Sequence, residues 1–452
     1  MHSQKNYLTV DHSHLFAQLR QAASHIIERA RAVGADQAEV NCSHTTGVNV
    51  SVRMGQTETI ETTCDRGVAV TVYFNGRKGS ASTADLHDSS LETTVTQACA
   101  IARFTEPDAA SGLADADLMA QSCPDFQTWH PWTANPDVLL EKALQCETAG
   151  RDADTRIHNS DGGFAGSSRS VSVYANSHGF IGEEAQTYHS IGCTLIAGQG
   201  EQMQRDGWYT SGLAVDDLLS PVEVGCVAAE RTLARLAPRR VQTDQVPVIF
   251  SPEVSRSLLG HFFSAISGSA LYRQSSFLLD SLGQRIFPAW LRINECPHIV
   301  HGLRSSGFDA DGVATRQADI VVDGVVQRYL LGSYSARRLG LQTTANAGGI
   351  HNIQVNATVE DMDAMIRHLP RGLLVTELMG QGVNPVTGDY SRGAAGFWID
   401  QGQIAFPVDG ITIAGQLRQM FAAIEAVGKD FDRRSHLHVG AILIGQMTVA
   451  GD

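Results

Sequence analysis

The chain has 452 residues, of which 43% are hydrophobic and 18% are charged, and its formal net charge is −14. This composition is typical of a globular protein with a large interior, and a chain of this length is expected to form two or three domains. The negative charge argues against nucleic acid or an anionic membrane surface as the main partner. Because no apolar run long enough to span a membrane and no secretory signal occurs, we expect a cytoplasmic protein with no membrane partner.

The N-terminal third predicts helices packed on an antiparallel sheet. A helix is predicted over residues 14–34, with one apolar stripe at helical spacing formed by Leu15, Leu19, Ala22, Ile26 and Ala30. A second helix is predicted over residues 90–104. Between them, short runs of alternating apolar and polar residues are separated by glycines and by the hairpin signal Asn75-Gly76. A helix-and-sheet unit of this kind is α+β, and we place this domain at residues 1–106.

The middle of the chain predicts a linker followed by further strands and helices. Residues 107–135 are rich in Asp, Ala, Ser and Pro, which is typical of a linker or a mobile loop. The following elements are predicted, in order: a helix at 137–150, strands near 170–177, 180–187 and 190–197, and a helix at 221–236. We expect this region, residues 107–240, to pack with the N-terminal domain.

The remainder, residues 241–452, is rich in glycine and in short apolar runs. Short strands separated by glycine turns predict a β-rich, barrel-like domain. The whole chain is therefore expected to be α+β. Its eight cysteines lie between Cys42 and Cys296 without any C-x-x-C pair, which favours free thiols over a disulfide framework or a zinc ribbon.

One segment of the C-terminal region, residues 251–277, predicts a helix that ends in a Gly/Ser-rich turn. Four apolar residues recur at every fourth position and should be buried on one face: Val254, Leu258, Phe262 and Ile266. His261 is the only histidine of this segment, and no acidic residue occurs between Glu253 and Asp280. A structural histidine is the simpler interpretation of His261.

Three other kinds of metal site can be compared with the sequence. No histidine is followed by glutamate, which excludes the H-E-x-x-H zinc motif. The segment FDADG at 308–312 resembles the start of a calcium loop, but the closing glutamate is missing, so we interpret it as a turn. His436 and His438 alternate on a predicted strand, and surface or interface histidines explain them better than a metal site.

Four phrases of the sequence, in their order and spacing, resemble the TldD/PmbA family of modulators of DNA gyrase. They are MGQTETIETTCDRGVAVTVYFNGRKGSAST, SSGFDADGVATRQADIVVDGVVQRYLLGSYSARRLGL, TTANAGG and VTELMGQGVNPVTGDYSRGAAGFWIDQGQIAFPVDGITIAGQL. The resemblance runs from about residue 15 to the last residues. The phrase ELMGQGVNPVTGDYSRGAAGFWI is similar to the PmbA branch, which is also called TldE.

The resemblance implies a heterodimer whose TldD-like subunit carries H-E-x-x-x-H on the helix after the first strand of its C-terminal domain, and a later cysteine ligand. Matching the glycine and arginine after that motif to Gly268 and Arg273 places Leu259, Gly260 and Ser264 at the ligand and base positions. Leucine and glycine cannot bind zinc, and no cysteine follows Cys296. The resemblance therefore implies that this chain has no catalytic residue, metal or other cofactor, and that zinc belongs to the TldD-like partner.

Two functions remain open. In the first, the chain is a non-metal-binding subunit that pairs with a TldD-like metallopeptidase and helps to hold unfolded peptides. The family implies a microcin precursor and the CcdA antitoxin as substrates. In the second, the chain is a stand-alone regulatory or binding protein, of the gyrase-modulator or carbon-storage-regulator type, without proteolysis. A homodimer is possible when the partner is absent. An autonomous hydrolase using Ser264 or Ser267 lacks a positioned base.

We expect the inner wall of a chamber shared with the partner to be lined by five polar residues: Ser264, Ser267, Ser269, Arg273 and Asn346. Small polar side chains and exposed glycine backbone suit an extended peptide because they offer hydrogen bonds without demanding one particular side chain. The simpler alternative is that these residues only form the end of a helix and a turn.

Overall fold

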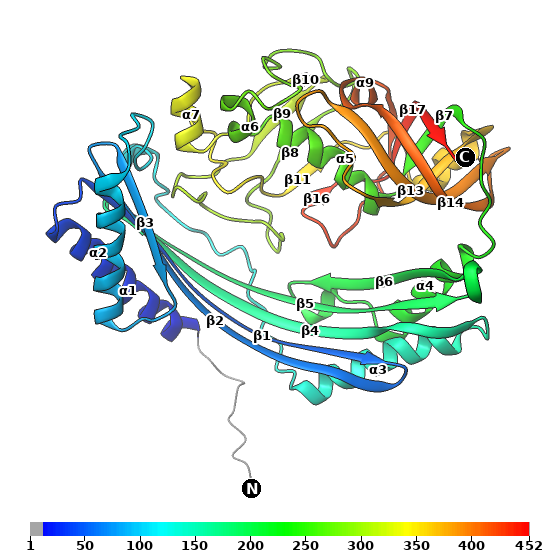
Figure 1. Ribbon diagram of the computed structural model, residues 1–452, viewed down its shortest axis with the longest axis horizontal. Coiled ribbons are helices and arrows are strands. Elements are labelled where there is room, and N and C mark those ends of the chain that lie inside the picture. Colours follow the sequence, from blue (N-terminus) through cyan, green and yellow to red (C-terminus); the bar gives the residue numbers. More distant parts are fainter. Residues whose placement is uncertain (1–11, 452) are drawn as a thin grey trace, which may run out of the picture.

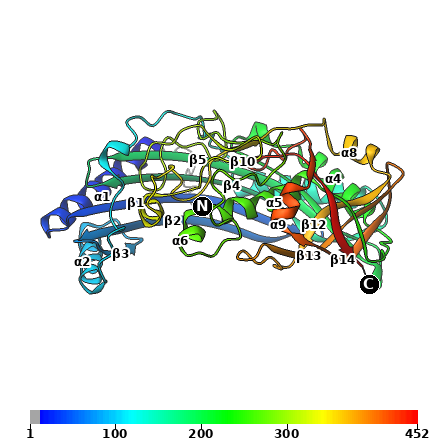
Figure 2. The same cartoon turned by 90° about the horizontal axis from the view of Figure 1, so that it is seen from above.

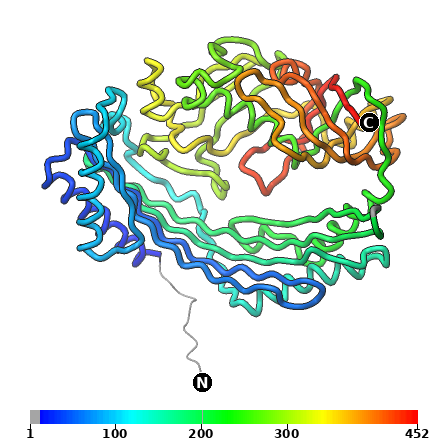
Figure 3. The backbone as a smooth tube through the Cα atoms, viewed as in Figure 1, coloured from blue at the N-terminus to red at the C-terminus, as the bar shows by residue number. Residues whose placement is uncertain are grey.

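The computed structural model describes residues 12–451 and contains a long curved sheet with a β-rich domain beside it (Figures 1 and 3). The sheet has the order β3-β2-β1-β4-β5-β6, and every neighbouring pair is antiparallel. Its strands are Gln37–Arg53 (β1), Gln56–Phe74 (β2), Arg77–Thr83 (β3), Ile157–Asn176 (β4), Ile181–Ala197 (β5) and Gln204–Gly212 (β6). Strand β1 pairs with β4, so two meanders that are distant in the sequence share one sheet.

Four helices pack on this sheet in two pairs (Figure 1). They are His12–Ala32 (α1), Asp88–Phe104 (α2), Pro136–Asp152 (α3) and Pro221–Ala234 (α4). Helices α1 and α2 enclose one apolar cluster against β1 to β3, and α3 and α4 enclose a second one against β4 and β5. The predicted apolar stripe of α1 is buried in the first cluster: Leu15, Leu19, Ala22, Ile26 and Ala30.

The segment predicted as a linker, residues 107–135, runs between the long sheet and the C-terminal domain. Its Thr128 hydroxyl donates a hydrogen bond to the carbonyl of Ala185 on β5 at 2.6 Å. Its Phe126 carbonyl accepts one from the His301 amide of the C-terminal domain at 2.7 Å. The connection is therefore packed against both domains, although it contains only one short 3₁₀ helix, Ala116–Leu118.

The C-terminal domain contains a closed barrel, which confirms the barrel-like prediction. The strand order is β14-β13-β12-β7-β17-β15, and β14 also pairs with β17, which closes the sheet on itself. Only the β7–β12 pair is parallel among these neighbours. The strands are Asp244–Phe250 (β7), Arg371–Met379 (β12), Asp389–Asp400 (β13), Gln403–Gln416 (β14), Ile424–Val427 (β15) and Ile442–Ala450 (β17).

A second, smaller sheet with the order β10-β9-β8-β11-β16 lies beside the barrel. Its strands are Ile293–Glu295 (β8), Ala318–Val322 (β9), Val325–Val326 (β10), Ile353–Val355 (β11) and Leu437–His438 (β16). The helices of this domain are Pro252–Ala265 (α5), Gly268–Tyr272 (α6), Ser333–Leu339 (α7), Met362–His368 (α8) and Leu417–Ala422 (α9). One large apolar core fills the space between α5, the barrel and the small sheet. The fold is α+β, as predicted.

The C-terminal domain lies against the concave side of the long sheet (Figures 1 and 2). A small apolar cluster joins the two, and its members come from the linker, from β4 and the turn after it, and from C-terminal loops: Met119, Tyr174, Phe180, Phe308, Val313 and others. All eight cysteines are unpaired. Within residues 12–451, every helix is too short or too polar to cross a membrane.

Candidate functional site

Helix α5 directly follows β7, the first strand of the C-terminal domain, and its apolar face is buried as predicted. Pro252 occupies the first turn, where its missing amide hydrogen costs nothing. Leu258, Phe262 and Ile266 are fully buried. The ring of Phe262 packs edge-on against Phe287 with centroids 4.8 Å apart. Helix α5 is therefore fixed between the barrel and the small sheet.

The three positions at which the family resemblance implied zinc ligands do not fit a metal. The Leu259 side chain is only 1% exposed and belongs to the apolar core. Gly260 and Ser264 lie on a cavity wall, but glycine has no ligand atom and a serine hydroxyl is a weak ligand for zinc. Within residues 12–451, no three or more His, Cys, Asp or Glu side chains gather in a way that would hold a metal ion.

His261, the histidine of α5, contacts an aromatic ring rather than a catalytic partner. Its ring lies edge-on to Tyr390 of β13, with centroids 6.0 Å apart, and its Nε2 atom has no hydrogen-bond partner. Burial and the nearby Arg392 charge lower the pKa of His261. Burial raises the pKa of Tyr390 to about 12. Both groups are therefore neutral near pH 7.

A cavity of about 1350 Å³, which we call the α5 cavity, opens beside α5 and α6. The five residues that we expected to line a peptide chamber all lie on its wall: Ser264, Ser267, Ser269, Arg273 and Asn346. The Ser267 hydroxyl accepts a bond from the Ala270 amide at 3.4 Å and so caps α6. The Arg273 guanidinium stacks on the Tyr272 ring at 5.5 Å. The fold thus brings residues of two distant segments, 264–273 and 346, to one cavity.

The side chain of Asn346 is occupied by structural hydrogen bonds. Its Nδ2 donates to Oε1 of Glu295 at 2.8 Å, and its Oδ1 accepts from Arg328 at 2.6 Å and from the Thr344 hydroxyl at 2.9 Å. Asn346 is 5% exposed. It therefore positions the loop at residues 346–350 and offers little of its own side chain to a ligand.

Glu295 is the centre of this buried network, and sequence reasoning missed it. Its carboxylate accepts bonds from Arg328 at 2.7 Å, from Asn346, and from both the amide and Nδ1 of His351 at 2.9 and 3.0 Å. Burial alone would raise the pKa of Glu295, but the hydrogen bonds and charge of His351 and the charge of Arg328 outweigh it and lower the pKa. Only the tertiary fold brings these four residues together, since they are separated by up to 56 positions.

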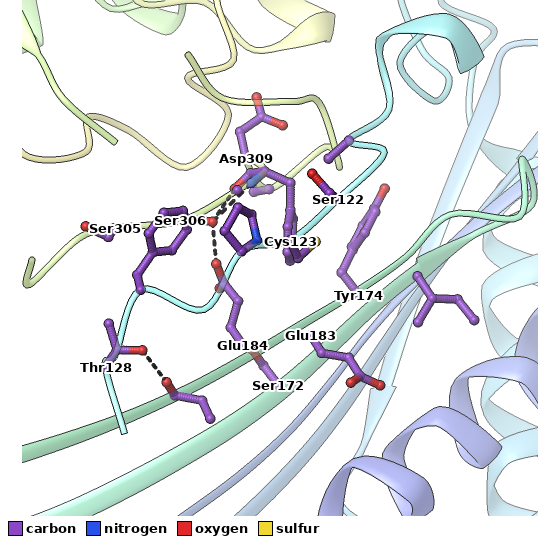
Figure 4. A pocket seen from close by; sticks show the side chains of 18 of the residues that line it. Ser122, Cys123, Thr128, Ser172, Tyr174, Glu183, Glu184, Ser305, Ser306 and Asp309 are labelled. Carbon is purple, nitrogen blue, oxygen red and sulfur yellow. Dashed lines mark hydrogen bonds between the residues drawn. The ribbon is translucent and has the colours of Figure 1, made fainter. Parts of the chain in front are cut away.

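A second cavity of about 1460 Å³, which we call the interdomain cavity, lies between the long sheet, the linker and C-terminal loops. Figure 4 shows the labelled carboxylates Glu183, Glu184 and Asp309 among serines of the linker and of the loop at 305–306. Burial raises the pKa of Glu184, whose carboxylate accepts a hydrogen bond from Ser306. Burial and the charge of Asp311 raise the pKa of Asp309 to about 7.

Asp309 belongs to the FDADG segment, which forms a turn. Its Oδ1 accepts the amides of Asp311 and Val313, both at 3.0 Å, and its Oδ2 accepts the Ala347 amide at 2.9 Å. Gly312 has a positive φ of 79°, which suits glycine. The carboxylate is used to join this turn to the 346–350 loop. Since residues 347–350 line both cavities, that loop forms the wall between them.

The two histidines near the C-terminus lie in different surroundings. His436 lies on the wall of the α5 cavity, and burial together with the Arg304 charge lowers its pKa to about 4. His438 stacks on the Phe431 ring with centroids 4.4 Å apart, and burial lowers its pKa. Both imidazoles are therefore neutral near pH 7.

Comparison with known proteins covers nearly the whole chain. Three family models match in order: PmbA/TldA metallopeptidase domain 1 at residues 38–102, the central domain at 129–236 and the C-terminal domain at 243–451. The chain is 46% identical to metalloprotease PmbA from Escherichia coli O157:H7 over 433 residues, which covers 96% of each chain. It is 44% identical to the PmbA homologue of Haemophilus influenzae, again with 96% of each covered.

Solved structures show the same fold. A protein described as a modulator of DNA gyrase from Bacteroides thetaiotaomicron superposes with a TM-score of 0.91 at 27% identity, and the match covers 96% of this chain and 99% of that one. TldE from Thermococcus kodakarensis superposes with a TM-score of 0.83 at 20% identity over 95% of this chain and 100% of that one.

Proposed function

Because this chain belongs to the PmbA/TldD metallopeptidase family, we propose that it is the non-metal-binding subunit of a heterodimeric protease whose zinc is held by a TldD-like partner. One observation supports this proposal above the others. The positions on α5 at which the resemblance implies the ligands and the base are occupied by the buried Leu259, by Gly260 and by the exposed Ser264. Zinc needs nitrogen, sulfur or carboxylate ligands to activate water, and these side chains supply none.

In this proposal the chain contributes a binding wall and the partner contributes the chemistry. The α5 cavity offers the serine hydroxyls of Ser264 and Ser269, the guanidinium of Arg273 and the exposed backbone of Gly348 and Gly349. These groups can bond to an extended peptide main chain with little dependence on its side chains. We therefore propose unfolded peptides as the substrates, with microcin precursors and the CcdA antitoxin as the kinds that the family resemblance implies.

The test is a reconstitution with a TldD-like metallopeptidase encoded in the same genome. We expect the two chains to co-purify and to cleave an unstructured peptide, and we expect this chain alone to cleave none. Arg273→Glu should lower turnover by the mixed complex while complex formation and the partner's zinc content stay unchanged. Arg285→Glu, an exposed arginine outside the lining of both cavities, is the matched control.

Two outcomes would contradict the proposal. Stoichiometric zinc that is lost on Ser264→Ala or His261→Ala would show a metal site on α5. A failure to form any complex with the TldD-like chain would favour a stand-alone regulatory or binding protein. Wild-type turnover by the Arg273→Glu complex would leave the pairing intact but would make the α5 cavity a scaffold only.

A further inference from the structure

The wall of the α5 cavity is locally basic in an acidic protein. Its lining holds the arginines Arg256, Arg273 and Arg434 against the single carboxylate of Asp311, whereas the whole chain has a formal net charge of −14. The Asp311 carboxylate is already occupied, since its Oδ2 accepts the Ser333 amide at 2.8 Å. A cavity lined by charge of this sign attracts a ligand that carries negative charge.

Two of these arginines are neutralised by a carboxylate, and the third is not. Nitrogens of Arg434 and Arg256 lie 2.7 and 3.3 Å from oxygens of the Asp432 carboxylate. Among residues 12–451, Arg273 has no carboxylate within ion-pair distance, and its Nε donates to the hydroxyl of Tyr272 at 3.2 Å. Arg273 therefore keeps its charge available to a ligand in the cavity.

Three polar atoms beside the cavity have no hydrogen-bond partner among residues 12–451. They are Nε2 of His261, the hydroxyl of Tyr390 and Nε of Arg392. Tyr390 is only 1% exposed. Buried polar groups in folded proteins nearly always have a partner, so a buried group without one calls for a ligand, an ion or a water.

These three groups lie together on facing elements. Tyr390 and Arg392 are two positions apart on β13, so their side chains project to the same face of the strand. The Tyr390 ring lies edge-on against His261, which lines the cavity, with centroids 6.0 Å apart. Val383, which forms a β-bridge with Tyr390, lines the cavity as well. A Cβ at Gly260 would meet no atom within 4 Å, which leaves room for a ligand beside His261.

All three groups can donate a hydrogen bond to one negatively charged acceptor. The Nε–H of arginine is always a donor, a tyrosine hydroxyl can donate, and a neutral imidazole can carry its proton on Nε2. Burial is the main cause of the lowered pKa of His261 and of the raised pKa of Tyr390, and the Arg392 charge acts on both groups, so its guanidinium lies near both. A carboxylate accepts several hydrogen bonds at once, and they are stronger than those to a neutral acceptor.

We propose that the α5 cavity binds the carboxylate of a peptide ligand. The groups that receive it are His261, Tyr390 and Arg392, and Arg273 adds its charge from the cavity wall. The peptide nature of the ligand rests on the proposed function, whereas the preference for a carboxylate rests on the cavity itself. The carboxylate belongs either to an acidic side chain or to the C-terminus of the peptide. This preference adds a substrate class, carboxylate-bearing unfolded peptides, to the main-chain bonding described above.

The test measures binding to the full chain alone by fluorescence anisotropy of labelled, unstructured peptides of equal length on a Gly-Ser background. Three peptides carry glutamate, glutamine or lysine and have amidated C-termini, and a fourth carries glutamine and has a free C-terminus. We expect the glutamate peptide, the free C-terminus peptide or both to bind at least about 5-fold more tightly than the amidated glutamine peptide. Which of the two does so identifies the source of the carboxylate. Because the net charge of the chain is −14, non-specific attraction would favour the lysine peptide instead.

Two substitutions separate binding from folding. Tyr390→Phe should weaken binding of the carboxylate peptide about 10-fold without lowering Tm, because the hydroxyl has no partner in the free chain. Arg273→Gln should weaken it about 3-fold and should make binding less sensitive to salt. The matched controls are Tyr188→Phe and Arg285→Gln, which change an exposed tyrosine and an exposed arginine outside the lining of both cavities. Neither control should change the affinity.

Three results would overturn the proposal: equal affinity for all four peptides, tightest binding of the lysine peptide, or wild-type affinity of both Tyr390→Phe and Arg273→Gln. None of these results depends on the TldD-like partner, so each leaves the heterodimer proposal to its own test. A chain that bound the glutamate peptide but formed no complex with that partner would refute the heterodimer and keep the carboxylate site.

Discussion

The α5 cavity and the interdomain cavity are similar in size, yet they differ in the chemistry of their walls. The lining of the α5 cavity combines serines with arginines and histidines, and its single carboxylate is Asp311. The interdomain cavity collects carboxylates and histidines from the linker, the long sheet and C-terminal loops. The two walls thus differ most in their carboxylates, which gather where the domains meet and not at the position that the family resemblance singles out.

The strongest test of this contrast is to install the missing motif on α5. Leu259→His should lower the free energy of unfolding by about 3–5 kcal/mol, because it places an imidazole in an apolar core that leaves it no partner. The triple change of Leu259→His, Gly260→Glu and Ser264→His should create no peptidase activity, since the later cysteine and the orienting contacts are still missing. Thermal or denaturant unfolding and a peptide assay provide the measurements.

The matched control for Leu259→His is Leu282→His, because Leu282 is 45% exposed. Leu282→His should change the free energy of unfolding by less than about 0.5 kcal/mol. A triple variant that folded as well as the wild type and cleaved peptides would remove the contrast between the two cavities. It would also show that the surroundings of α5 can support a metal site once the ligands are supplied.

The position of the 346–350 loop, which separates the two cavities, should depend on the hydrogen bonds of Glu295. Glu295→Gln should cost about 3 kcal/mol of stability, because it leaves the buried Arg328 guanidinium without its counter-charge. Glu360→Gln, which breaks the exposed pair with Lys429, should cost about 0–1 kcal/mol. Equal effects of the two changes would mean that the network does not hold the 346–350 loop. Denaturant unfolding measures both.

The raised pKa of Asp309, on the wall of the interdomain cavity, predicts that the stability of the folded chain depends on pH. A carboxyl group whose pKa is raised in the folded state stabilises the folded chain most at a pH below the pKa that the group has in the unfolded chain. For Asp309 this contribution is lost as the pH rises towards about 7. Asp309→Asn should remove that decline, so the variant should gain about 1 kcal/mol or more relative to the wild type between pH 4 and pH 7.

The measurement for Asp309→Asn is the slope of the free energy of unfolding against pH. Stability at one pH is not sufficient, because asparagine also loses the hydrogen bond from the Ala347 amide. Asp117→Asn, an exposed carboxyl on the same cavity wall, should leave the slope unchanged. Parallel curves for wild type and Asp309→Asn would show that the carboxyl titrates normally and is not isolated from water.

The smallest expected effect concerns Gly260, on the wall of the α5 cavity. A Cβ at Gly260 would meet no atom within 4 Å, so Gly260→Ala should stabilise the helix by about 0.5–1 kcal/mol. Gly150→Ala in α3 is the opposite case, because its Cβ would lie 2.7 Å from a Leu195 methyl and 2.9 Å from the Gly225 carbonyl. If Gly260→Ala destabilised the chain, the α5 face would not border open space.

Local patterns in the sequence determined most of the fold class. The stripe of Leu15, Leu19 and Ile26 and the face of Leu258 and Phe262 are buried as predicted, because a helix with a 3.6-residue period buries the side on which its apolar residues recur. The glycine-punctuated strands at the end of the chain predicted a barrel. The chemistry of three α5 positions is also a property of the sequence alone, since no folding can add a nitrogen or sulfur atom to the side chains of Leu259, Gly260 or Ser264.

Only the tertiary structure decided which residues became neighbours. The Glu295 network and the contacts of His301 with His130 and Asp217 each combine residues that lie tens to more than a hundred positions apart, and no local spacing relates them. The raised pKa of Asp309 likewise arises from burial beside Asp311 and under a loop from residue 347. Contacts between distant segments depend on how sheets and loops pack in three dimensions, whereas periodicity reports only which face of a single element avoids water.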